Sequence, residues 1–205
     1  MFSLFKHKGK IEQPKEVELT GRELLADPAA LADWVGQHFL KSRPWQNNLE
    51  LLPDTSAQEA LDITFAEKER FAKENSVLRI VGVLMFMQQI ESQDYSEKFL
   101  SYLAGELAAA INEPRLEVGQ ALTDYLRLCV AGDDARVATL YLERIHGQNP
   151  NYLRMKISGV GSTGPSTIAD TYDIFRDAYW QFRTGYTYAE AMQKVAEAKK
   201  VAEAD

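Results

Sequence analysis

The residues with the clearest chemical spacing form a glycine-rich stretch, Gly159-Val160-Gly161-Ser162-Thr163-Gly164, which matches the pattern G-x-G-x-x-G. A turn of this kind lets backbone amides approach a phosphate at the start of a helix. The stretch follows the alternating, strand-like segment 153–158 and precedes a helix that we expect to open at Pro165 or Ser166. One hypothesis is therefore a small-molecule or phosphate site over 159–167, with the candidate residues Gly159, Gly161, Ser162, Thr163, Gly164 and Ser166.

The sequence around this stretch does not complete a nucleotide-binding unit. A dinucleotide fold requires a second parallel strand that ends in an acidic residue roughly 20 residues further on, whereas 178–188 is aromatic and helical in pattern. A Walker-type loop requires a Lys after its last glycine, and Pro165 follows Gly164 here. A plain connecting loop is therefore our main expectation for 159–167, and a loop that binds or gates a polypeptide is a third interpretation.

A Glu-x-x-His pair, Glu143 and His146, has the helical spacing used by di-iron bundles. Such sites need a second pair and two further Glu residues, and the other histidines, His7 and His38, have no Glu three residues before them. We therefore predict no metal site. His146 precedes Gly147, and we expect it at a helix C-terminus, where the helix dipole favours a protonated imidazole.

The single cysteine, Cys129, lies on the same side of an expected helix as Leu122, Leu126 and Val130. This placement predicts a small hydrophobic core residue rather than a nucleophile. No G-x-S-x-G motif occurs in the chain. The sequence therefore predicts no catalytic residue and no cofactor, and an enzyme is the less favoured class.

Aromatic residues are densest between 172 and 188. Phe175, Tyr179 and Phe182 have i, i+4, i+7 spacing, so we expect one buried stripe, which Tyr172 extends by a turn. Other rings of the segment point elsewhere, and amphipathic rings left at a surface are good anchors for a protein interface. Our candidate interaction residues are Trp180, Tyr186, Tyr188 and Tyr179, and packing within the domain is the competing use of the same rings.

Composition excludes several functional classes. One cysteine in 205 residues cannot form an intramolecular disulfide framework, which indicates a reducing, cytosolic environment. A net charge of -7 argues against nucleic acid as a partner, because phosphate binding requires a basic face. The longest apolar run, 80–87 with Gly82 included, falls short of the roughly 20 residues of a transmembrane helix. The Phe- and Lys-containing N-terminus allows at most weak contact with a membrane surface.

Helix starts are marked by capping residues whose side chains accept free amide protons of a first turn. The predicted boxes, each with Glu three positions after the cap, are Thr20–Glu23, Ser56–Glu59, Asp94–Glu97 and Thr187–Glu190. Proline at a first helical position marks two further starts, Asp27-Pro28 and Glu113-Pro114. Gly132, Gly147 and Gly185 suit left-handed helix ends.

These signals predict helices near 28–41, 56–74, 76–91, 95–111, 114–131, 134–146, 166–184 and 188–204. The second and third of them could form one long helix. Residues 77–87 are apolar nearly all round, which predicts a buried central helix, with a buried strand as the alternative. Alternation at 153–158 and 16–20 allows at most one minor β-ribbon.

The C-terminal helix carries a narrow seam of small residues, Ala191, Val195, Ala198 and Ala202. A helix with so little apolar surface needs a partner surface to be stable. That partner is either the aromatic stripe of its own domain or a second subunit.

Together these observations predict an all-α protein, an antiparallel helical hairpin array or bundle of about seven to eight helices. Residues 1–19 are expected to be a flexible lead-in, and 20–205 a single domain with 188–204 as a peripheral helix. The favoured function is a non-enzymatic, cytosolic interaction or regulatory protein that binds a protein partner or itself. The alternative is a ligand-binding protein or enzyme built around 159–167.

Overall fold

The computed structural model describes residues 20–41, 65–147 and 160–202. Over these residues the chain forms eight α-helices and one π-helical segment, with no strand. The elements are α1 (Gly21–Ala26), α2 (Pro28–Val35), the π-helical η1 (Gly36–Lys41), α4 (Phe65–Ile90), α5 (Gln93–Ile111), α6 (Arg115–Val130), α7 (Asp134–His146), α9 (Val160–Thr184) and α10 (Tyr188–Ala202). The all-α prediction is confirmed.

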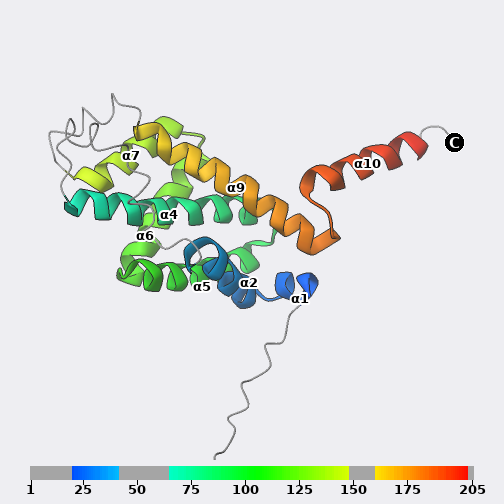
Figure 1. Ribbon diagram of the computed structural model, residues 1–205, viewed down its shortest axis with the longest axis horizontal. Helices are drawn as coiled ribbons and strands as arrows, with labels where there is room; N and C mark the ends of the chain where they lie inside the picture. Colours follow the sequence, from blue (N-terminus) through cyan, green and yellow to red (C-terminus); the bar gives the residue numbers. More distant parts are fainter. Residues whose placement is uncertain (1–19, 42–64, 148–159, 203–205) are drawn as a thin grey trace, which may run out of the picture.

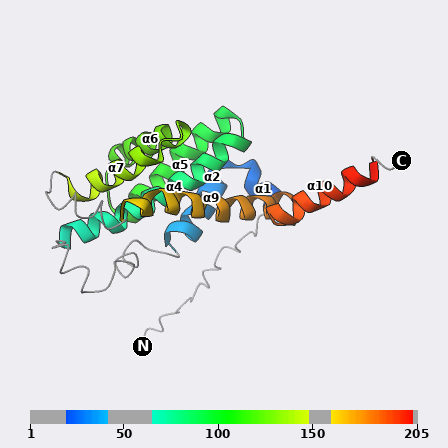
Figure 2. The same cartoon turned by 90° about the horizontal axis from the view of Figure 1, so that it is seen from above.

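The long helix α4 is the centre of the molecule, with α5, α6, α7 and α9 packed around it (Figures 1 and 2). Between Val77 and Met87 its side chains are buried except for Arg79 and Met85, which are half-buried. The predicted central helix is confirmed, and the strand alternative is wrong. The helices predicted at 56–74 and 76–91 are continuous from Phe65 onward, since Asn75 and Ser76 are buried inside α4.

One glycine lets α4 approach α9 closely. A Cβ atom at Gly82 would lie 2.5 Å from the backbone oxygen of Ile168 and 3.0 Å from the backbone nitrogen of Tyr172. Real Cβ atoms do not come so near to backbone atoms, so glycine is required at this crossing. The close approach brings Ile168 and the aromatic stripe of α9 into the core.

Two predicted capping boxes form as expected. The backbone amide of Thr20 donates to Glu23 at 2.8 Å, and the Glu23 amide donates back to the Thr20 hydroxyl at 3.4 Å. Thr187 and Glu190 exchange the same pair of bonds at the start of α10. These starts were predictable because a cap depends on a few neighbouring residues.

Two other predicted starts are displaced by one or two residues. Ser92 rather than Asp94 caps α5, its hydroxyl accepting from the amide of Tyr95. The helix α6 begins at Arg115, so Pro114 precedes the helix and provides no side-chain cap. The predicted box at 56–59 and the alternating segments at 16–20 and 153–158 lie outside the described residues.

The glycine-rich stretch differs from the sequence expectation. Helix α9 already begins at Val160, so 160–164 are helical and the predicted connecting loop is wrong there. Gly164 lies against Tyr141 of α7, where an added Cβ would be 3.4 Å from the Tyr141 side chain. Pro165 lies inside the helix, near its start, where its missing N–H removes one helical hydrogen bond.

Buried polar pairs fix α6 and α7 against the first half of α4. The Tyr125 hydroxyl donates to Glu74 at 2.7 Å, and the Tyr141 hydroxyl donates to Asn75 at 2.9 Å. His146 is buried, with its Nδ1 3.0 Å from a carboxylate oxygen of Glu67. His146 ends α7 before Gly147, as predicted, and it is in addition a core residue paired with α4, which the sequence did not indicate.

Candidate functional site

Two places bring predicted functional residues together: the junction of α9 with α10, and a cavity between α4, α6, α7 and α9. The aromatic stripe of α9 leads to the first of them. Phe175 and Tyr179 are buried and pack edge-on against Phe86 of α4, with ring centroids 5.7 and 5.1 Å apart. Tyr179 is 1% exposed, and its hydroxyl donates to the carboxylate of Glu91. This candidate interaction residue is therefore a core residue whose ring does not reach the surface.

The other three candidate interaction residues do surround the junction. The rings of Trp180 and Tyr188 lie 5.9 Å apart, and the guanidinium of Arg176 sits 4.6 Å from the Tyr188 ring centroid. Tyr186 is exposed, and the ammonium of Lys194 lies 3.6 Å from its ring centroid. Cation–π contacts of this kind fix the direction in which α10 leaves α9.

Beyond this junction α10 loses contact with the rest of the molecule. Ala191, in its first turn, is 8% exposed, whereas Val195 is 48% exposed and Ala198 is exposed as well. Figures 1 and 2 show α10 extending away from the other helices. Ala191 packs within the described part of the chain, but Val195 and Ala198 are exposed and do not dock on the aromatic stripe. The predicted docking of the whole seam within the chain is therefore not the arrangement of the described residues.

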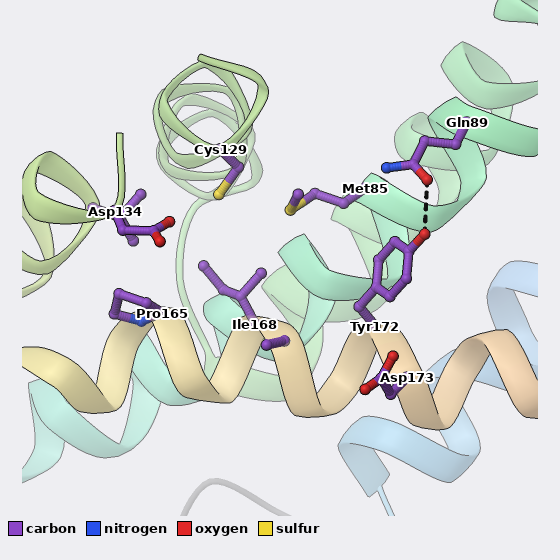
Figure 3. A pocket seen from close by; sticks show the side chains of 10 residues that line it. Met85, Gln89, Cys129, Asp134, Pro165, Ile168, Tyr172 and Asp173 are labelled. Carbon is purple, nitrogen blue, oxygen red and sulfur yellow. Dashed lines mark hydrogen bonds between the residues drawn. The ribbon is translucent and has the colours of Figure 1, made fainter. Parts of the chain in front are cut away.

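The second place is a cavity of about 330 Å³, lined by side chains of four helices (Figure 3). The sulfur atoms of Cys129 and Met85 and the side chain of Ile168 point toward the same space. At one side the Tyr172 hydroxyl donates to Gln89 at 2.7 Å. The remaining described lining residues are Asp134, Val137, Pro165, Ala169 and Asp173.

Residues that directly follow the glycine-rich stretch line this cavity. Pro165 lines it, followed by Ile168 and Ala169 of the same helix, while Gly164 packs on Tyr141 instead. Gly159 lies outside the described residues, and so do the side chains of 161–163. Two carboxylates, of Asp134 and Asp173, line the cavity. Asp173 is paired with Arg176, but the negative charge of Asp134 disfavours an anion among the described lining residues.

The sequence predicts Cys129 in the core. In the structure it is only half-buried, at the wall of the cavity. Val130, predicted on the same buried side, is 74% exposed. Burial raises the pKa of the Cys129 thiol to about 11, and the negative charge of Asp134 adds to this rise. The thiol is therefore protonated at neutral pH and is a poor nucleophile.

The Glu-x-x-His pair does not form a metal site in the described part of the chain. Glu143 is exposed and lies 3.6 Å from Arg136, whereas His146 faces Glu67. No group of three or more potential ligand residues is close enough to hold a metal ion among the described residues. Among the described helices, none combines the length and hydrophobicity that a membrane span requires.

Sequence reasoning missed the cavity because its walls come from distant segments. Met85 lies in a helix predicted to be buried all round, and Asp134 lies at the start of the helix predicted over 134–146. Met85 is half-buried because the packing around α4 leaves a gap there. The hydrophobic pattern of the sequence does not reveal such a gap. Comparison with known proteins finds no relative: no family model matches the chain, and no curated protein or solved structure matches it.

Proposed function

We propose that this chain is a non-enzymatic, cytosolic interaction protein, and that its binding element is α10, which pairs with α10 of a second copy. The observation that carries the proposal is the exposure of two seam residues of α10, Val195 and Ala198. The capping box at Thr187 and the ring contact between Trp180 and Tyr188 hold the beginning of the helix.

An isolated helix of 15 residues is marginal in water, because nucleation is costly and is repaid only by packing. Residues 193–198 of α10 are exposed and lack such packing against the described residues. A partner that covers Val195 and Ala198 would supply the missing contacts. The proposal thus explains why a helix with a well-formed start continues into solvent.

The size of the seam residues favours a second copy as partner. Alanine and valine have short side chains, so a partner makes van der Waals contact with them only if it comes close to the helix. Close approach requires that the partner's side chains are short as well. Another α10 meets this condition, and Val195 lies at the middle of the helix, where a two-fold axis would bring it against its own copy. The contact area of two short helices is small, so we expect a reversible, concentration-dependent dimer.

Light scattering coupled to gel filtration tests this proposal with a matched pair of variants. Ala198 lies in the seam, while Ala196 lies on another face of α10, and both are exposed. Ala198→Glu places a charge in the proposed contact, and Ala196→Glu makes the same change outside it. We expect the mass of the parent chain and of Ala196→Glu to rise toward that of a dimer with concentration, and Ala198→Glu to stay monomeric. A parent chain that is monomeric throughout, or a dimeric Ala198→Glu, would show that self-association through this seam is wrong.

A further inference from the structure

A second binding activity is indicated by the cavity between α4, α6, α7 and α9, which is separate from α10. We propose that this cavity binds a small organic amine in its protonated form. The apolar part of the ligand enters between Met85, Cys129 and Ile168. Its charged nitrogen lies beside Asp134 at the opening of the cavity.

The size and lining of the cavity fit a small molecule. A volume of about 330 Å³ lies at the lower end of the range for small-ligand sites, which are mostly apolar with a few polar groups. Most of the wall is apolar: two sulfur-containing side chains, Ile168, Val137, Pro165 and Ala169. Sulfur side chains are polarizable and adapt to aromatic rings, so the deep part suits an aromatic or aliphatic group.

The charge of the wall decides which class of ligand fits. Of the described residues that line the cavity, two are Asp, and none is Lys, Arg or His. Asp173 is balanced by Arg176, whose Nη1 lies 2.7 Å from its carboxylate. Asp134 supplies the remaining negative charge at the opening. A ligand with a positive charge is therefore attracted, and an anion of the same shape is repelled.

The pKa of the Cys129 thiol depends on its surroundings in the wall of the cavity. Its pKa is raised to about 11, by burial first and by the negative charge of Asp134 second. The charge of Asp134 is thus felt at the inner wall. Burial disfavours any ion at this wall, but the charge of Asp134 that disfavours a thiolate also favours an ammonium group beside it.

The structure also explains how the polar side of the cavity is kept in place. The hydrogen bond from Tyr172 to Gln89 ties α9 to the end of α4, and the Tyr172 ring packs edge-on against Phe86 at 5.5 Å. Asp133, not Asp134, caps α7 through the amide of Arg136. Asp134 can therefore be changed without removing the helix cap.

Three probes of similar shape separate the charge classes: benzylamine as the cation, benzyl alcohol as the neutral molecule and benzoate as the anion. Binding is followed by NMR of the full chain with labelled Met and Ile methyl groups, because Met85 and Ile168 report directly from the cavity. We expect benzylamine to shift both methyl signals saturably, with an affinity above that of benzyl alcohol and far above that of benzoate. Equal affinities for the three probes, or no saturable shift with benzylamine, would overturn the proposal.

Variants then assign the charge recognition to one residue. Asp134→Asn should weaken benzylamine by about fivefold and leave benzyl alcohol unchanged, which also shows that the cavity is intact. Asp170→Asn removes an exposed charge of α9 outside the cavity and should change neither affinity. Ala169→Phe places a bulky ring at the wall of the cavity and should weaken binding of both probes. Unchanged benzylamine affinity in Asp134→Asn, or full binding in Ala169→Phe, would contradict the assigned site.

Discussion

Replacing Gly82 by alanine tests the packing of α4 on α9, on which the whole fold depends. Alanine is favoured over glycine inside a helix by about 1 kcal/mol. At Gly82, however, the new methyl group would lie 2.5 Å from the Ile168 oxygen and 3.0 Å from the Tyr172 nitrogen. Both are backbone atoms, so α9 itself must move, and such overpacking costs typically about 1 to 3 kcal/mol or more. After subtraction of the helix preference, the net expectation is a loss of about 0 to 2 kcal/mol in the free energy of unfolding, in contrast to the gain expected at an unhindered site.

Gly119 provides the matched control, because it lies inside α6 with nothing within 4 Å of an added Cβ. Gly119→Ala should raise the free energy of unfolding by about 0.5 to 1 kcal/mol. Urea denaturation followed by the helical circular dichroism signal measures both changes. The free energy of unfolding should fall with urea concentration at the same slope in all variants, which shows that they share one unfolded state. If Gly82→Ala were as stable as Gly119→Ala, the close crossing of α4 and α9 would be wrong.

Three further predictions concern side chains with defined partners. Cys129 should react slowly with iodoacetamide at pH 7 and faster as the pH rises toward about 11, because only the thiolate reacts and the pKa of the thiol is raised. Fast labelling of the folded chain at pH 7 would contradict the half-buried position of Cys129. Tyr125→Phe removes the hydroxyl that donates to buried Glu74 and should lower the free energy of unfolding by about 1 to 3 kcal/mol. The same change at exposed Tyr102 should stay within about 0.5 kcal/mol, and equal effects in urea would refute a role for the Glu74 bond. Thr187→Ala should destabilise α10 by about 1 kcal/mol. The loss should appear as reduced helical NMR shifts over 188–198, and Thr187→Ser should restore them. If Thr187→Ala caused no loss of helicity, the cap would be dispensable.

Features that depend on near neighbours in the chain were predictable from the sequence. The boxes at Thr20 and Thr187 form because cap and Glu are three residues apart. The glycines that end α6, α7 and α9 have positive φ values of 68°, 60° and 80°, which glycine adopts without strain. The buried helix over 77–87 followed from its apolar surface on all sides.

Features that depend on tertiary packing were not predictable. The glycine-rich pattern indicated a loop, but Gly164 instead lets α9 pack on Tyr141, a contact between residues far apart in the sequence. His146 was placed at a helix end, and only the position of Glu67 on α4 makes it a buried partner. Asp134 and Met85 line the same cavity only when the four helices are packed as in the folded structure. Distances of this kind follow from the folded arrangement and leave no local pattern.

Cross-linking through a single cysteine tests the central proposal, pairing of α10 with its own copy, most directly. Replacing Cys129 by Ser leaves no other cysteine in the chain. A new cysteine can then be placed in the seam by Val195→Cys, or outside it by Ala196→Cys, and both positions are exposed in the single chain. Under mild oxidation we expect Val195→Cys to form a covalent dimer much faster than Ala196→Cys, at concentrations where the parent chain associates. Equal rates for the two variants, or no covalent dimer with Val195→Cys, would contradict the proposed pairing.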